Sequence, residues 1–173
     1  MADLVTHMCT VLLPAALFRS RWVGVAAVGA ALPDLVSRLP GEALERLRAV
    51  GVPVPDWALM PWGMLHNPIP LVAVCALASV TFRVDLRARA WLSLMVGCVA
   101  HLMLDVLQDH HGHGYHLWFP VHAGDWELGW IHSEATVAFA PGLAVVTALA
   151  WAVRWGVDRG GRSGPPRDRD GSA

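Results

Sequence analysis

Residues 90–107 read AWLSLMVGCVAHLMLDVL, an apolar run that is the best candidate in this chain for a membrane-spanning helix. Two polar side chains interrupt the run near its end, His101 and Asp105. They stand four positions apart, so a helix places them on one face. Because an unpaired acid among apolar neighbours is costly inside a membrane, the pair needs a His–Asp hydrogen bond, a water-lined cavity or a shared metal ion.

The composition of the whole chain suits a membrane protein. The 173 residues are 55% hydrophobic and 16% charged, whereas a soluble domain usually carries about 25% charged residues. The sequence has no basic stripe interleaved with aromatic residues, which disfavours nucleic-acid binding. Cys9, Cys75 and Cys98 lie in apolar runs without metal-ligand spacing, and we interpret them as small buried hydrophobic residues.

Four further apolar runs lie at about 4–18, 22–33, 69–82 and 135–153. Together with residues 90–107 they predict an all-α polytopic membrane bundle of about five helices, in a single domain over residues 1–157. A full span needs about 20 apolar residues, and the first three runs are shorter than that. A soluble protein with a buried helical core is therefore the alternative.

The segments between and after the runs predict less regular structure. Leu32-Pro33-Asp34 ends the second run, and Gly41–Val50 has the pattern of a short amphipathic helix in the first long loop. The prolines at positions 53, 55 and 61 mark the remainder of that loop. Residues 158–173 are rich in Arg, Gly, Asp, Ser and Pro, and we expect a disordered tail there.

Arginines lie at one end of the apolar runs, and His, Asp and Glu gather at the other. Arg38, Arg46 and Arg48 are on the acidic side, and all the other arginines lie in the opposite turns and in the tail. By the positive-inside rule those turns and the tail are cytoplasmic. We expect an integral protein of a bacterial-type cell membrane, with the 35–65 and 108–133 loops on the outer side.

Helix geometry predicts that polar residues from different runs meet at one depth. A helix rises about 1.5 Å per residue, so counting from the arginine of each hairpin turn places His7 and His101 about 18 Å away and Asp34 about 20 Å away. The same count places Asp105 and His66 about 24–25 Å away. All five groups fall in one slab about 7 Å thick, which is the gathering that a metal ion needs.

The order of these residues resembles the YdjM-like family of membrane-bound metal-dependent hydrolases. The matching segments lie within residues 6–120 and are Thr6-His7, Leu32-Pro33-Asp34, Leu65-His66-Asn67-Pro68, His101 to Asp105, and Leu117-Trp118-Phe119-Pro120. Two segments depart from the family pattern. The family often has a second acid after Asp34, where this chain reads Leu35-Val36-Ser37-Arg38, and its two-histidine segment is reduced here to His66. The order of ligands is also similar, more remotely, to that of zinc-dependent phospholipase C, an all-helical phosphodiesterase.

The resemblance implies hydrolysis of an ester, and of a phosphoester above all, in a small-molecule or lipid substrate. The implied ligands of a divalent metal, zinc by preference, are His7, Asp34, His66, His101 and Asp105. Asp34 and Asp105 are also the candidate catalytic carboxylates, since one of them could orient the attacking water. Two alternatives remain open: a metal-binding or transport protein without hydrolysis, and a structural membrane protein whose polar cluster only locks the helix ends.

Other polar and aromatic residues have more than one interpretation. The histidines of the 109–116 tract either complete the site or form a solvated loop, and they are His110, His111, His113 and His116. Glu134 is a cap acid of the last helix or a further ligand, and His122 is expected at the surface. The aromatic residues Trp118, Phe119, Trp126 and Trp130 are expected at the headgroup level, as anchors or as the lining of a lipid entrance.

Overall fold

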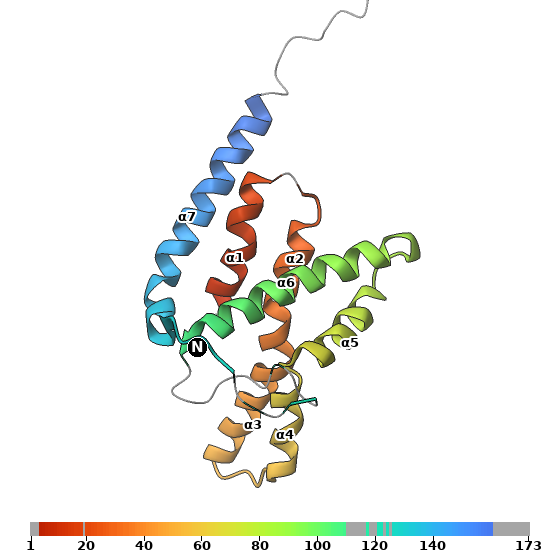
Figure 1. The fold of residues 1–173 in the computed structure, drawn as a ribbon, viewed down its shortest axis with the longest axis vertical. Coiled ribbons are helices and arrows are strands. Elements are labelled where there is room, and N and C mark those ends of the chain that lie inside the picture. The colour runs from red at the N-terminus through yellow and green to blue at the C-terminus, as the bar shows by residue number, and fades with distance from the viewer. Residues whose placement is uncertain are drawn as a thin grey trace, which may run out of the picture.

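The structure is a computed structural model that describes residues 4–18, 20–109, 117, 121–122, 124 and 126–160. The structure consists mainly of helices, and it also contains one pair of two-residue strands (Figure 1). The elements are α1 (Leu4–Leu17), α2 (Val23–Pro33), the π-helical turn η1 (Asp34–Arg38), α3 (Leu39–Ala49), α4 (Asp56–Met64), α5 (Pro68–Ser79), the 3-10 turn η2 (Val84–Leu86), α6 (Arg87–Leu107), β1 (Gln108–Asp109), β2 (Ile131–His132) and α7 (Ser133–Gly160).

Three helical segments in the described part of the chain are long and apolar enough to cross a membrane: Val23–Ala49, Val84–Leu107 and Ala135–Arg159. The pair Asp56–Met64 and Pro68–Ser79 passes the same test only together, and the two helices are bent by 81°. Leu4–Leu17 is apolar but shorter. The predominantly helical fold is therefore confirmed, and three of its segments have the length and composition of membrane spans, while the bundle of five spanning helices stays a prediction.

Helix α6 lies at the centre of the fold and crosses α1 and α2 obliquely, while α7 runs beside α1 (Figure 1). Two glycines allow α2 and α6 to touch backbone to backbone. A Cβ atom on Gly29 would lie 2.2 Å from the Leu94 carbonyl oxygen, and one on Gly97 would lie 2.0 Å from the Ala26 carbonyl oxygen. This close approach brings the backbone of α2 within reach of His101.

The prediction that Leu32-Pro33-Asp34 ends a helix is wrong. Helix α2 continues through η1 into α3 without a break. Pro33 lacks the N–H that the Gly29 carbonyl would otherwise receive, and the Cys98 thiol donates to that carbonyl instead, with Sγ and O 3.2 Å apart. The helix continues past Pro33 because a side chain of another helix replaces the missing donor and a wide π turn accommodates the change in hydrogen bonding.

The loop expected around the prolines at 53, 55 and 61 is also wrong from Asp56 onward. Asp56–Met64 forms α4, with Pro55 in extended backbone directly before it and Pro61 inside it. A proline just before a first turn costs no helical hydrogen bond, so Pro55 begins this helix rather than preventing it. The amphipathic helix expected at Gly41–Val50 is present as α3, Leu39–Ala49.

The C-terminal helix is longer than the apolar run that predicted it. Helix α7 extends to Gly160, beyond Asp158, where we expected the tail to begin. Arg154 lies 3.9 Å from Asp158 across one turn, and its guanidinium donates to the carbonyl oxygens of Ala15, Ala16 and Phe18. These contacts tie the arginine-rich end of α7 to the end of α1. Residues 161–173 lie outside the described residues.

Candidate metal centre

The five residues that the sequence analysis singled out come together in space. They arrive from four separate parts of the chain: His7 from α1, Asp34 from η1, His66 from the turn between α4 and α5, and His101 and Asp105 from α6. Potential ligand atoms of His7, His101 and Asp105 lie within 4.8 Å of one another, and so do those of Asp34, His66 and His101. The five groups thus lie close together in space, as predicted.

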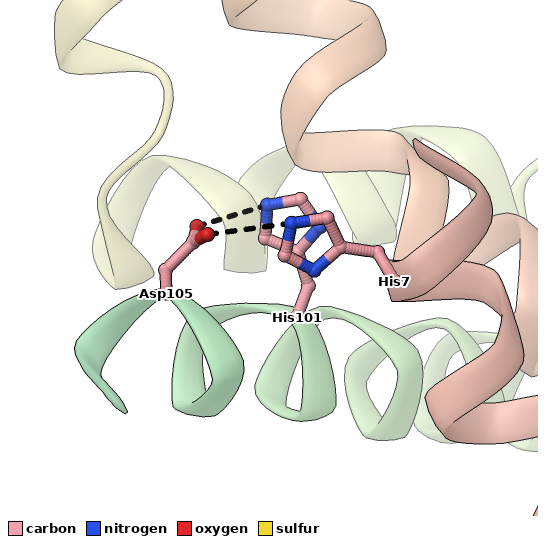
Figure 2. A group of neighbouring side chains, drawn as sticks. All are labelled: His7, His101 and Asp105. Atoms are coloured by element: carbon pink, nitrogen blue, oxygen red, sulfur yellow. Dashed lines mark ion pairs between the residues drawn. The ribbon is translucent and has the colours of Figure 1, made fainter. Parts of the chain in front are cut away.

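The Asp105 carboxylate is the centre of the cluster, because all three imidazoles face it. Its Oδ1 lies 3.3 Å from His7 Nε2, and its Oδ2 lies 2.8 Å from His66 Nε2 and 3.1 Å from His101 Nε2. Figure 2 shows the rings of His7 and His101 directed at this carboxylate from α1 and α6. The His–Asp contact expected from the spacing in residues 90–107 therefore exists, and two more imidazoles extend it.

The ring of His101 is held in one orientation by the backbone of α2. Its Nδ1 lies 2.7 Å from the Ala30 carbonyl oxygen. Because a carbonyl oxygen can only accept, Nδ1 carries the hydrogen and Nε2 faces the cluster. The Asp34 N–H bonds to the Ala31 carbonyl, three residues earlier, rather than to that of Ala30.

The ring of His66 is oriented in the same way by Ser37. The Ser37 hydroxyl donates to the Pro33 carbonyl at 2.6 Å, so its oxygen accepts from His66 Nδ1 at 3.0 Å. Nδ1 of His66 therefore carries its hydrogen as well, and Nε2 faces Asp105. Outer hydrogen bonds that fix the tautomer of an imidazole are a general feature of metal-binding histidines.

The third imidazole, His7, packs flat against His101, with ring centroids 3.6 Å apart and an angle of 17° between the planes. Its Nδ1 is buried and has no hydrogen-bond partner within the described residues. One nitrogen of His7 thus faces Asp105, and the other is enclosed without a partner of its own.

These hydrogen bonds leave the cluster short of positive charge at its centre. With Nδ1 protonated, neutral His66 and His101 both direct an Nε2 lone pair at the Asp105 carboxylate, and the two Nε2 atoms lie 3.3 Å apart. Protonating both rings would instead place two like charges in contact. A single cation among these atoms removes both conflicts, and either a proton on one ring or a metal ion can supply that charge.

Two of the four contacts within the cluster have the spacing of a tetrahedral site. Zinc–nitrogen bonds of about 2.0–2.1 Å place neighbouring ligand atoms of a tetrahedron about 3.3–3.4 Å apart. The contacts of His7 Nε2 with Asp105 Oδ1 and of His66 Nε2 with His101 Nε2 are both 3.3 Å. The contacts of Asp105 Oδ2 with the Nε2 atoms of His66 and His101 are shorter, at 2.8 and 3.1 Å. Imidazole nitrogens and carboxylate oxygens are common ligands of divalent metal ions, so the donor set fits a metal ion.

Asp34 stands at the edge of the cluster rather than at its centre. Its Oδ1 lies 3.9 Å from His101 Nε2. The side chains of Asp34 and His66 are 14% and 12% exposed, whereas those of His7, His101 and Asp105 are 1%, 0% and 4% exposed. The cluster is therefore closed on the α1 side and reaches solvent on the side of Asp34 and His66.

Sequence reasoning missed the residues that orient the rings. Ser37 appeared only as part of a departure from a family pattern, and Ala30 was not considered. A signal for Ser37 existed, because it follows Asp34 by three positions and would share its helical face. The spacing could not be interpreted in this way because the helix was expected to end at Asp34. Nothing in the sequence distinguishes the Ala30 carbonyl from its neighbours.

Most of the remaining candidate residues lie outside the part of the chain that the structure describes. His110, His111, His113 and His116 lie outside the described residues, as do Trp118, Phe119 and the side chain of Glu134. His122 is exposed, as expected, and Trp126 and Trp130 are exposed as well. The cysteines are buried, as expected, and the Sγ atoms of Cys75 and Cys98 lie 3.5 Å apart.

Comparison of the chain with protein-family models, with curated proteins and with solved structures finds no match.

Proposed function

We propose that the protein is a membrane-bound, zinc-dependent hydrolase of a phosphoester, built as a bundle of about five membrane-embedded helices. The observation that carries the proposal is the common orientation of His66 and His101. Each has Nδ1 engaged by an outer partner and Nε2 directed at Asp105. A cluster of this kind without a cation would leave lone pairs opposed in a buried place, which is unfavourable.

The residues divide into two roles by their position. His7, His66, His101 and Asp105 would hold the ion, because each imidazole directs its Nε2 at the Asp105 carboxylate, and the attacking water would need a further coordination position. Asp34, at the more exposed edge and 3.9 Å from His101, is the carboxylate left to accept a proton from the attacking water. When bound, a divalent ion lowers the pKa of coordinated water toward neutrality and polarises a phosphoryl oxygen.

An apolar cavity beside the cluster supports a lipid as the substrate. The cavity has a volume of about 520 Å³. Its lining includes Pro68, two positions after His66, and Leu102 and Val106, each directly after a cluster residue on α6. Ile69 and Met103 also contribute, and both are exposed. A chain of methylene groups in this cavity would bring an attached phosphoester toward the open side of the cluster.

Membrane association and the arginine distribution support the placement of the site on the outer side. The arginines of the α1–α2 and α5–α6 connections stand at the end of the helices away from the cluster, and positive residues favour the cytoplasmic side.

Metal content and turnover, measured on the same preparations, test the proposal. The wild-type protein is expected to retain about one zinc per chain after dialysis and to hydrolyse a phosphodiester, and the His101→Ala and Asp105→Ala variants are expected to lose both properties. The matched control is Asp56→Ala, because Asp56 is an exposed acid paired with Arg48. No bound metal in the wild type, or equal metal in the variants, would refute the metal site.

A metal site without hydrolysis is the second candidate, favoured by the near-complete burial of His7, His101 and Asp105. Structural zinc sites are closed by four protein ligands, whereas catalytic sites keep one position open. The Asp34→Asn variant separates the two. If the site is catalytic, this variant keeps its zinc and loses turnover. If the site is a closed structural one, neither the wild type nor the variant shows turnover, and the loss of any ligand lowers the zinc content.

A further inference from the structure

A second site lies at the opposite, arginine-rich end of the bundle. An open cavity of about 480 Å³ lies between the α1–α2 connection and the first turns of α6, and its lining residues are Ser20, Arg21, Trp22, Arg89, Leu92 and Ser93. Two guanidinium groups, two hydroxyl groups and an indole ring thus surround one hollow. Phosphate groups are bound by side chains of this kind.

An apolar cavity continues from this hollow into the bundle. It has a volume of about 360 Å³ and shares Ser20, Trp22 and Ser93 with the first cavity. From there it passes between α1, α2 and α6 as far as Thr10 and Ala100. Along α6, the distance from Arg89 to Ala100 is about 16 Å. The two cavities together form a cationic mouth with an apolar channel behind it.

The two arginines at the mouth, Arg21 and Arg89, have no carboxylate partner in the part of the chain that the structure describes. Nearby arginines are different: Arg83 pairs with Asp85 at 3.2 Å, and Arg154 donates to carbonyl oxygens of α1. A pair of uncompensated cations at the membrane surface attracts an anion.

We propose that this composite cavity binds one anionic phospholipid, with its phosphate at Arg21 and Arg89 and an acyl chain in the apolar channel. A free phosphate would leave the channel empty, and an uncharged lipid would leave the cations without a partner. The bound lipid is not the substrate of the metal centre. Arg89 and His101 are separated by about 18 Å along α6, so a phosphate at the mouth cannot reach the cluster.

Native mass spectrometry of the detergent-solubilised protein tests the charged part of this site. The wild type is expected to retain one phosphatidylglycerol in preference to phosphatidylcholine. The double variant Arg21→Gln/Arg89→Gln is expected to weaken that retention by roughly tenfold or more, since each arginine near a charged surface contributes about 1 kcal/mol. Arg83→Gln is the control, because Arg83 lies in a neighbouring turn but already has a carboxylate partner. Equal retention in all three proteins would overturn the proposal.

A second pair of variants tests the apolar channel. Val96 lines it and is exposed, so Val96→Phe is expected to fill the channel and displace the lipid without disturbing the core. Val145→Phe is the control, since Val145 is equally exposed on α7. Competition with inorganic phosphate distinguishes the two sources of the anion: phosphate that displaces the lipid at equal concentration would contradict a role for the acyl chain. Retention of metal by every variant shows that the metal centre is a separate site.

Discussion

Nε2 of His66 lies 2.8 Å from Oδ2 of Asp105, although 39 residues separate them in the sequence. His66 comes from the turn between α4 and α5, and Asp105 comes from the last turns of α6. The contact is therefore made only when α5 and α6 pack together. The hydrogen bond between Ser37 and Nδ1 of His66 orients the His66 ring toward Asp105. Three segments must therefore be in place for the two atoms to meet.

The Ser37→Ala variant tests whether this support matters for metal binding. Without the hydroxyl, His66 Nδ1 loses its partner and the ring can turn or change tautomer. Loss of an outer hydrogen bond of this type usually weakens metal binding by about 10–100-fold. The measurement is the zinc dissociation constant, obtained by competition with a chelator.

The matched control is Ser93→Ala, because the Ser93 hydroxyl also bonds to the carbonyl four residues earlier, that of Arg89. Ser93 lies at the other end of the bundle and contacts none of the metal-binding rings. An unchanged dissociation constant in Ser37→Ala, or an equal change in both variants, would count against the role of Ser37.

The cluster could be predicted from the sequence because the patterns that indicate it are local. The spacing of His101 and Asp105 fixes a shared helical face, and the rise per residue fixes depth along each helix. Depth along an axis does not give rotation about it or the direction in which helices cross. The 2.8 Å contact of His66 with Asp105 and the stacking of His7 on His101 depend on packing. Neither contact could be predicted from spacing.

The close approach of α2 and α6 leads to a prediction about stability. Gly97→Ala is expected to lower the free energy of unfolding by about 1–3 kcal/mol or more, because the new methyl group meets the backbone of α2 rather than a flexible side chain. Zinc affinity should fall in parallel, since separating the helices lengthens the bond from His101 to the Ala30 carbonyl. Thermal unfolding in detergent measures the first effect.

Gly24→Ala is the control for this prediction. It lies on α2, and a Cβ atom there meets nothing within 4 Å. A glycine inside a helix is less favourable than alanine by about 0.8–1.0 kcal/mol, so this variant should be neutral or slightly more stable. If Gly97→Ala behaves like Gly24→Ala, the helices do not pack as closely as described.

The apolar cavity beside the metal centre predicts a dependence on substrate length. Met103→Trp is expected to narrow the cavity and to raise KM for a long-chain phospholipid several-fold. Turnover of a short, water-soluble phosphodiester should be unchanged, because the residues of the cluster are untouched. A matching loss with both substrates would indicate damage to the site instead of a role in binding acyl chains.

The arginine distribution predicts the orientation of the protein in the membrane. The native cysteines are buried, so single cysteines introduced at exposed positions can be labelled selectively in intact cells. Gly51→Cys, in the turn after α3, is expected to react with a membrane-impermeant reagent. Asp85→Cys, in the turn before α6, is expected to react only after the cells are opened. The reverse pattern would place the metal centre on the cytoplasmic side.

Prolines explain where the helix boundaries were misjudged. Pro33 and Pro61 lie inside helical segments, where a proline ordinarily removes a hydrogen bond and breaks the helix. At Pro33 the freed Gly29 carbonyl accepts from Cys98, a partner from another helix. A sequence shows the missing donor but not the distant replacement.

X-ray absorption at the zinc edge of the purified, zinc-loaded protein tests the metal centre most directly. A site made of imidazoles and a carboxylate predicts nitrogen and oxygen ligands at about 2.0–2.2 Å, with the outer-shell scattering of imidazole rings. The signal is expected to be lost in Asp105→Ala. Sulfur ligands at about 2.3 Å would assign the metal to cysteines instead. That result, or a protein that takes up no zinc, would contradict a site formed by His7, His66, His101 and Asp105.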